Sequence, residues 1–181
     1  IKNIKPVITM FFKNIANFNN TSDYLPLLNG VLMTDLFVIL LSNSKIIKSQ
    51  VLVDWYSKYN LSAVIADVLI ILIGLIIARA IYYSIFDSFS ITRFVILAVL
   101  VQIAHDMLFY LVFKNVPRGF NRMLDTFKEY AAEVSYKAVL ADSGMMVMAA
   151  LIASFLASKT ANTNIIVLVV ALYLLPYILY N

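Results

Sequence analysis

Five segments of the chain are almost purely apolar, and shorter polar stretches separate them. Each segment is about as long as a helix must be to cross the hydrocarbon core of a bilayer. Pro117 and Gly119 end the third segment, because both residue types interrupt helices. The predicted membrane spans are residues 24–41, 61–83, 94–113, 138–157 and 165–180.

Two further segments, residues 1–20 and 118–136, carry apolar side chains every three to four residues with polar ones between. This spacing is typical of an amphipathic helix that lies in the membrane interface or docks on a partner protein. The apolar stripes comprise Ile4, Val7, Ile8, Phe11, Phe12, Ile15 and Phe18 in the first segment, and Phe120, Met123, Leu124, Phe127, Ala131 and Val134 in the second. The predicted fold class is all-α: a polytopic membrane helical bundle, one domain over residues 1–181, with about five spans and two interfacial helices.

Composition supports the same class of protein. The chain is 62% hydrophobic and 13% charged, whereas a soluble domain has about 25% charged residues. The absence of cysteine excludes disulfides and thiolate chemistry, and a single histidine leaves little for a metal site, so we expect no metal and no cofactor. The net charge of +4 is small and spread over the loops, so we expect no nucleic-acid partner. Because the sequence starts with Ile1, we expect a processed product or a piece of a longer one.

An internal repeat links two of the spans. Residues 61–69 read LSAVIADVL and residues 136–144 read YKAVLADSG, with an aspartate at the same place in each copy. The upstream pairs DW at 54–55 and EY at 129–130 align in the same register. The simplest interpretation is a duplicated helical hairpin in parallel orientation, as internal repeats are common in membrane folds. Chance similarity between Ala/Val/Leu-rich helices is the alternative.

Ionisable side chains inside the spans are the candidate functional residues. Counted from the segment ends, the four aspartates and the histidine lie at one level, roughly 6–10 Å below one surface of the bilayer. The predicted layer consists of Asp35, Asp67, His105, Asp106 and Asp142. Three interpretations stay open: polar contacts that fix helix packing, a half-channel for protons or cations, or aspartates that cap helix starts and hardly enter the bilayer.

Two residues are predicted to anchor the chain at the membrane interface. Arg79 lies near the far end of its span and can extend its guanidinium to the interface. Trp55 lies just before a span, where aromatic rings favour the headgroup level. We predict no catalytic residues and no enzyme activity, because nucleotide fingerprints are absent and the aspartates lack the glycine that precedes those of intramembrane aspartyl proteases.

Three segments carry a resemblance to a known family. They are DWYSKYNLSAVIADVLI at 54–70, QIAHDMLFYLVFKNVPRGFNRMLDTFKEYAAEVSYKAVLADS at 102–143, and NTNIIVLVVALYLLPYILYN at 162–181. Together they resemble a small multi-spanning virion membrane protein of the nucleocytoplasmic large DNA viruses, the relatives of chlorella virus and mimivirus. The resemblance covers most of the chain after about residue 50, and no catalytic residues carry over from it.

The resemblance implies a structural role as a minor capsid component. The implied location is the internal membrane of the virion, and a host membrane during assembly. The implied partners are membrane lipid and capsid or other minor capsid proteins, with self-association as a further option. The alternative function is a small proton- or cation-conducting membrane protein that uses the aspartate layer.

Overall fold

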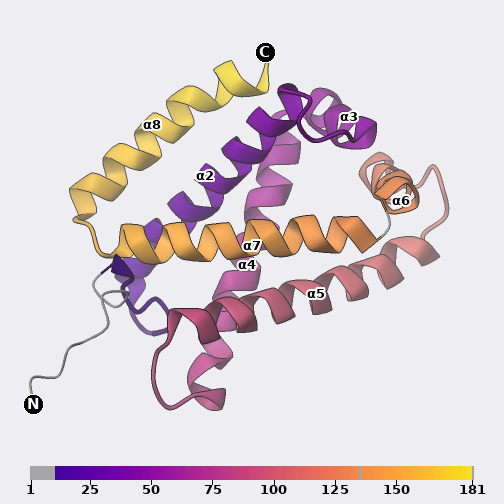
Figure 1. Ribbon diagram of the computed structural model, residues 1–181. Helices are drawn as coiled ribbons and strands as arrows, with labels where there is room; N and C mark the ends of the chain where they lie inside the picture. Colours follow the sequence, from indigo (N-terminus) through magenta and orange to yellow (C-terminus); the bar gives the residue numbers. More distant parts are fainter. Residues whose placement is uncertain (1–10, 135, 181) are drawn as a thin grey trace, which may run out of the picture.

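The computed structural model describes residues 11–134 and 136–180, and the fold is stated for these residues. Within them the chain forms seven α-helices and one short 3-10 helix, without strands (Figure 1). In chain order the elements are η1 Thr21–Asp23, α2 Tyr24–Asn43, α3 Gln50–Tyr59, α4 Leu61–Ile85, α5 Ile91–Asn115, α6 Arg122–Val134, α7 Tyr136–Ala157 and α8 Ala161–Leu179. The predicted all-α membrane bundle is confirmed.

The five long helices α2, α4, α5, α7 and α8 are apolar enough to cross a membrane. They fall on the five segments predicted to do so, and each reaches a few residues further toward the N-terminus, the C-terminus or both. Their outward faces are apolar too, as expected where lipid replaces water. On α4 one exposed stripe repeats every fourth residue and comprises Ile65, Leu69, Ile73, Ile77 and Ile81.

Helix α2 is the centre of the packing, in contact with α4, α7 and α8. Its approach to α7 is close because Gly30 has no side chain: a Cβ there would lie 2.7 Å from the Ala149 oxygen and from the Ala153 nitrogen. On α8, Asn164 accepts a hydrogen bond from Asn29 of α2 at 3.2 Å, a buried polar contact between two spans. The bundle is therefore held by small residues and buried amides as well as by apolar packing.

Helices α3 and α6 are short and amphipathic and lie against each other at one end of the bundle (Figure 1). Ser49 caps α3 through its hydroxyl, which accepts from the Leu52 amide at 3.2 Å. Asn121 caps α6 through its side-chain Oδ1, which accepts from the Met123 amide at 2.9 Å. Helix α6 lies within the predicted amphipathic segment 118–136, whereas α3 lies in one of the polar stretches between the predicted spans, for which no helix was predicted.

The N-terminal segment differs from the prediction. An amphipathic helix was expected over residues 1–20, of which 1–10 lie outside the described residues. From Phe12 to Asn20 the chain is not helical. Its backbone instead pairs with the end of α7: the Lys13 amide donates to the Ser154 oxygen at 3.1 Å, and the Ser154 hydroxyl donates to the Lys13 oxygen at 2.6 Å. The predicted helix is wrong for this stretch, because its apolar residues Ile15 and Ala16 are buried in the bundle and not in the interface.

The order of the helices repeats. A long, a short and a long helix, α2–α3–α4, are followed by a second long, short and long set, α5–α6–α7. The packing repeats with them: α2 contacts α4 and α7, and α5 contacts α7 and α4. Exchanging the two halves therefore leaves the pattern of contacts unchanged, which favours duplication over chance similarity. Helix α8 has no counterpart and packs mainly on α2.

Candidate functional site: an acidic cleft between the helices

A cleft of about 790 Å³ lies between six helices, α2 to α7. Most of its walls are apolar, from residues such as Val38, Ile70 and Phe109. The polar side chains on its walls include Trp55, Tyr56, Asp67, Gln102, His105, Asp106, Thr126, Tyr130 and Asp142. The structure thus brings four of the five predicted layer residues into one cavity, and only Asp35 is not on its wall.

Helix α3 supplies hydrogen bonds to two of the aspartates. The Trp55 indole Nε1 donates to Asp67 Oδ2 at 2.9 Å. The Tyr56 hydroxyl donates to Asp35 Oδ1 at 3.0 Å, and Asp35 is fully buried behind it. Burial first, and then the charges of Asp67 and Asp35, raise the pKa of Tyr56 well above its usual value. Tyr56 therefore stays a protonated donor, and α3 is tied to both α2 and α4.

A second set of polar contacts lies on α5. The Gln102 side-chain Nε2 donates to Asp106 Oδ1 at 2.7 Å, and His105 Nδ1 lies 3.2 Å from the same oxygen. Two acceptors in this set, Gln102 Oε1 and Asp106 Oδ2, are buried and have no hydrogen-bond partner among the described residues. The α5 cluster is therefore richer in acceptors than in donors.

Asp142 of α7 also lines the cleft, near Tyr130 of α6. Burial first, and then the charges of Asp142, Asp67 and Glu133, raise the pKa of Tyr130 to about 12. Tyr130 therefore lies near a carboxylate from each copy of the repeat, Asp67 and Asp142. Sequence reasoning identified the acids but missed Tyr56 and Tyr130 beside them; the aligned aromatic pair at 55 and 130, one helical turn and a half before each repeat, was a signal for Tyr130 only.

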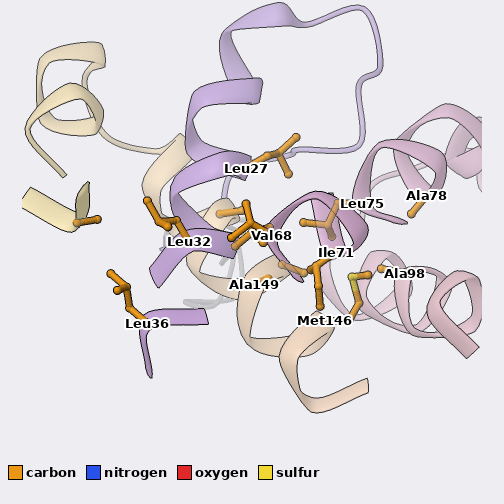
Figure 2. Close-up of a cluster of buried hydrophobic side chains, with 14 of the residues drawn as sticks. Leu27, Leu32, Leu36, Val68, Ile71, Leu75, Ala78, Ala98, Met146 and Ala149 are labelled. Carbon is orange, nitrogen blue, oxygen red and sulfur yellow. The ribbon is translucent and has the colours of Figure 1, made fainter. Parts of the chain in front are cut away.

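The cleft ends on a block of apolar side chains deeper in the bundle. Figure 2 shows Ile71 and Leu75 of α4 beside Met146 of α7, with Ala98 and Ala149 close by. All five of these side chains are at most 2% exposed. Beyond Gln102, the centre of the described bundle between α4, α5 and α7 is therefore filled by close-packed apolar atoms.

Arg79 lies beyond this block, and its predicted role as an interface anchor is wrong. The side chain is 1% exposed and its Nη2 donates to the Asn17 oxygen at 2.6 Å and the Asn20 oxygen at 3.0 Å. The guanidinium lies 3.8 Å from Asp23 and stacks over Tyr24, 4.8 Å from the ring centroid. Arg79 thus finds its partners in the N-terminal segment, which folds over it, and its guanidinium is not exposed for contact with lipid headgroups.

The prediction for Trp55 is wrong for a similar reason. The ring is 5% exposed and lies under α6, with its centroid 4.9 Å from that of Phe127. It is enclosed because α3 is a helix that docks on α6, and the Tyr59 hydroxyl strengthens this docking by donating to the Arg122 oxygen at 2.7 Å. Trp55 therefore belongs to the wall of the cleft, and not to a lipid-facing belt.

The carboxylates, the amide and the aromatic hydroxyls on the cleft wall can bind a cation and form hydrogen bonds with a bound molecule. Within residues 11–134 and 136–180 there is no group of three or more His, Asp or Glu side chains placed to hold a metal ion.

Comparison with protein-family models, with curated proteins and with solved structures gave no significant match. The proposed function of the protein therefore rests on the geometry of the site and on the sequence.

Proposed function

We propose that this protein is a structural component of the internal membrane of a large DNA virus particle, with α3 and α6 directed toward the capsid. The viral assignment is supported by the resemblance of residues 54–70, 102–143 and 162–181 to virion membrane proteins. The structural assignment is supported by one observation above others: two of the intramembrane aspartates, Asp35 and Asp67, fix α3 to two different spans.

The hydrogen bonds from Trp55 to Asp67 and from Tyr56 to Asp35 join a short surface helix to two different spans. On the α6 side, Glu133 accepts from the Ser49 hydroxyl at 2.9 Å, so the two short helices are also joined to each other. Buried polar contacts of this kind favour a single packing of the bundle over its alternatives. A protein that must present one surface in a fixed orientation gains from such a bundle.

The surface formed by α3 and α6 suits a protein partner. Its exposed charges alternate in sign, with Asp54 and Lys58 on α3 and Arg122 and Glu129 on α6. A surface with charges of both signs is better suited to bind a protein shell of complementary charge than an anionic lipid surface. Anionic lipid attracts segments that carry Lys and Arg without acidic residues. The exposed apolar stripes of the long helices are left for membrane lipid.

The alternative, proton or cation conduction, is favoured by the acidic cleft itself. Carboxylates and a histidine inside a membrane protein mark ion paths in many transporters. The apolar block at Ile71, Leu75 and Met146 opposes this function, because a conducting path must offer polar atoms or water across the whole bilayer. The structural function is therefore the better supported of the two.

A copy-number measurement tests the proposal. Quantitative mass spectrometry on particles of the virus whose genome encodes the chain is expected to find many copies, retained with the shell after mild detergent removes lipid. Few copies that leave with the lipid would contradict a capsid contact. A chain encoded by no virus would overturn the viral assignment altogether.

A flux measurement separates the two functions. In liposomes with a pH-sensitive dye inside, the purified protein is expected to leave proton leakage at the level of empty liposomes, and Asp67→Asn and Asp142→Asn are expected to change nothing. In Asp67→Asn the new amide keeps an oxygen that can accept from Trp55, and in both variants the side chain keeps its size, so the variants should still fold. A flux that the native chain supports and both variants abolish would favour the conducting function instead.

A further inference from the structure

We propose that the cleft binds a long-chain amine, with the ammonium group at Asp106 and Asp142 and the alkyl chain along the apolar walls. This inference is independent of the viral assignment. It begins from the combination of size and lining: about 790 Å³, mostly apolar, with a few polar groups that converge. Binding sites for small molecules typically have this character, with volumes of roughly 300–1,000 Å³.

The charge of the lining selects a cation. Asp67, Asp106 and Asp142 face the cleft, and none of the described residues that line it is a lysine or an arginine. His105 is the one lining group that can carry a positive charge, and it is already placed against Asp106 at 3.2 Å. A ligand with a positive charge would complement this lining, whereas a phosphate group would meet carboxylates and no basic partner.

The unpaired atoms select a hydrogen-bond donor. Gln102 is 2% exposed, lines the cleft, and uses its amide nitrogen on Asp106, so its Oε1 is left without a partner among the described residues. Asp106 Oδ2 is buried and unpaired in the same way. Both atoms are acceptors, and a buried acceptor without a partner destabilises the protein. A primary ammonium has three N–H groups and no acceptor, which matches this need.

The rim of the cleft selects an amphiphile over a small amine. Several lining residues are apolar and largely exposed on the outer surface of the spans, where lipid lies: Phe37, Met107, Leu111 and Tyr136. An alkyl chain that leaves the cleft at these residues passes from apolar wall to bilayer without meeting water. A compact inorganic cation is disfavoured, because no three acidic or histidine side chains of the described residues are placed to ligate one.

Trp55 provides the measurement, because it is the sole tryptophan in the sequence and lies on the cleft wall. The full chain in a neutral detergent is titrated with dodecylamine that carries bromine at the chain end, since bromine quenches a nearby indole. We expect saturable quenching of Trp55 by the amine and at least tenfold weaker quenching by the equally brominated dodecanol. Equal quenching by the amine and the alcohol would overturn the proposal, because the cleft would then bind the alkyl chain without recognising the ammonium group.

Two further comparisons fix the site and the ligand class. Asp106→Asn and Asp142→Asn are each expected to weaken amine binding at least tenfold, whereas Asp87→Asn, the same change on the exposed α4–α5 link, is expected to leave it unchanged. Unaltered binding in both cleft variants would place the amine elsewhere and overturn the proposal. Brominated lysophosphatidylethanolamine that binds as tightly as the amine would also overturn it, in favour of a zwitterionic lipid. The amine–alcohol comparison uses the native chain, so it stands even if a variant fails to fold.

Discussion

Arg79 is a charged side chain that meets neither water nor lipid. Its guanidinium is surrounded by the Asn17 and Asn20 carbonyls, the Tyr24 ring and the Asp23 carboxylate, and Lys13 approaches the same carboxylate at 3.0 Å. Two cations around one buried acid leave a local excess of positive charge, which the two backbone carbonyls offset. One side chain of α4 therefore holds the N-terminal segment in place together with the hydrogen bonds to Ser154 of α7.

Replacing Arg79 by leucine is expected to lower the free energy of unfolding by about 3 kcal/mol or more, because Asp23 loses one of its two cationic neighbours and two carbonyls lose the guanidinium donor inside the protein. The matched control is Arg93→Leu, an exposed arginine whose guanidinium stacks 5.6 Å from the Phe86 centroid; its loss should cost about 1 kcal/mol or less. Denaturant unfolding in detergent, followed by circular dichroism, measures both. Equal costs for the two variants would show that Arg79 is not the anchor.

Tyr130 gives a prediction in alkaline solution. Its pKa in the folded chain is about 12, above the value of about 10 for a free tyrosine, because burial and the carboxylates of Asp142, Asp67 and Glu133 oppose the phenolate. The contribution of this group to stability is therefore complete below about pH 10 and is lost as the pH rises toward 12. The absorbance titration of the native chain minus that of Tyr130→Phe should have its midpoint near pH 12.

In denaturant the same difference titration should move to about pH 10, where a solvent-exposed tyrosine ionises. A folded-state midpoint that already lies near pH 10 would mean that Tyr130 does not face the carboxylates of the cleft.

At the scale of single residues, the sequence predicts which acids lie together in the cleft but not which side chains contact them. Depth along each span placed Asp67, His105, Asp106 and Asp142 at one level, because a helix advances by a fixed rise per residue. The partners Tyr56 and Tyr130 depend on how α3 and α6 dock, which is a tertiary property. The errors at Arg79 and Trp55 have the same origin, since both were assigned to lipid before the elements that cover them were known.

Among the elements, α2 and α7 make the closest contact because Gly30 lets the backbones meet. A Cβ at this position would lie 2.7 Å from two backbone atoms, the Ala149 oxygen and the Ala153 nitrogen, neither of which can rotate away. The facing residues of α7 are alanines for the same reason. Small residues at helix contacts are the usual basis of close packing in membranes.

Gly30→Ala is expected to destabilise the protein by about 1–3 kcal/mol, because the added methyl group forces the two helices apart. Gly144→Ala is the matched control: it is also a helical glycine, of α7, and nothing lies within 4 Å of the added Cβ. There the better helix propensity of alanine should stabilise by up to about 1 kcal/mol. Thermal unfolding of the two variants in the same detergent gives the sign of each change, and two changes of the same sign would contradict the assignment of this contact.

Element prediction succeeded where the pattern was long and failed where it was short. The five spans follow from apolar runs that no soluble helix needs, and their positions were recovered to within a few residues. Helix α3 was missed, although Leu52, Trp55, Tyr56 and Tyr59 have helical spacing after the capping residue Ser49. The N-terminal stripe had the same spacing and is not a helix at Ile15, because hydrogen bonds to α7 compete with local structure there.

At the scale of the whole molecule, five crossings place the two ends of the helical bundle on opposite sides of the membrane. The N-terminal segment and the α4–α5 and α7–α8 links share one side, and α3, α6 and the end of α8 share the other (Figure 1). The absence of cysteine makes this testable, because any introduced thiol is unique.

Single variants Ser88→Cys and Ser158→Cys, in the two links, are expected to react with a membrane-impermeant maleimide from one side of sealed vesicles. Ser57→Cys on α3 and Glu129→Cys on α6 are expected to react only from the other side. All four residues are exposed, so differences in reactivity report the side and not burial. Labelling of Ser57→Cys and Ser88→Cys from the same side would show that α4 does not cross the membrane.

The near-equivalence of α2–α4 and α5–α7 also bears on ancestry. A half-length chain could close the same bundle as a homodimer, with a second copy of itself across a two-fold axis. In such an ancestor every substitution occurs twice, so the aromatic residue above each aspartate cannot vary in one copy alone. Fusion of two genes removes that restriction. On the duplication interpretation, tryptophan at 55 and tyrosine at 130 differ because the two halves became free to change separately once they formed one polypeptide.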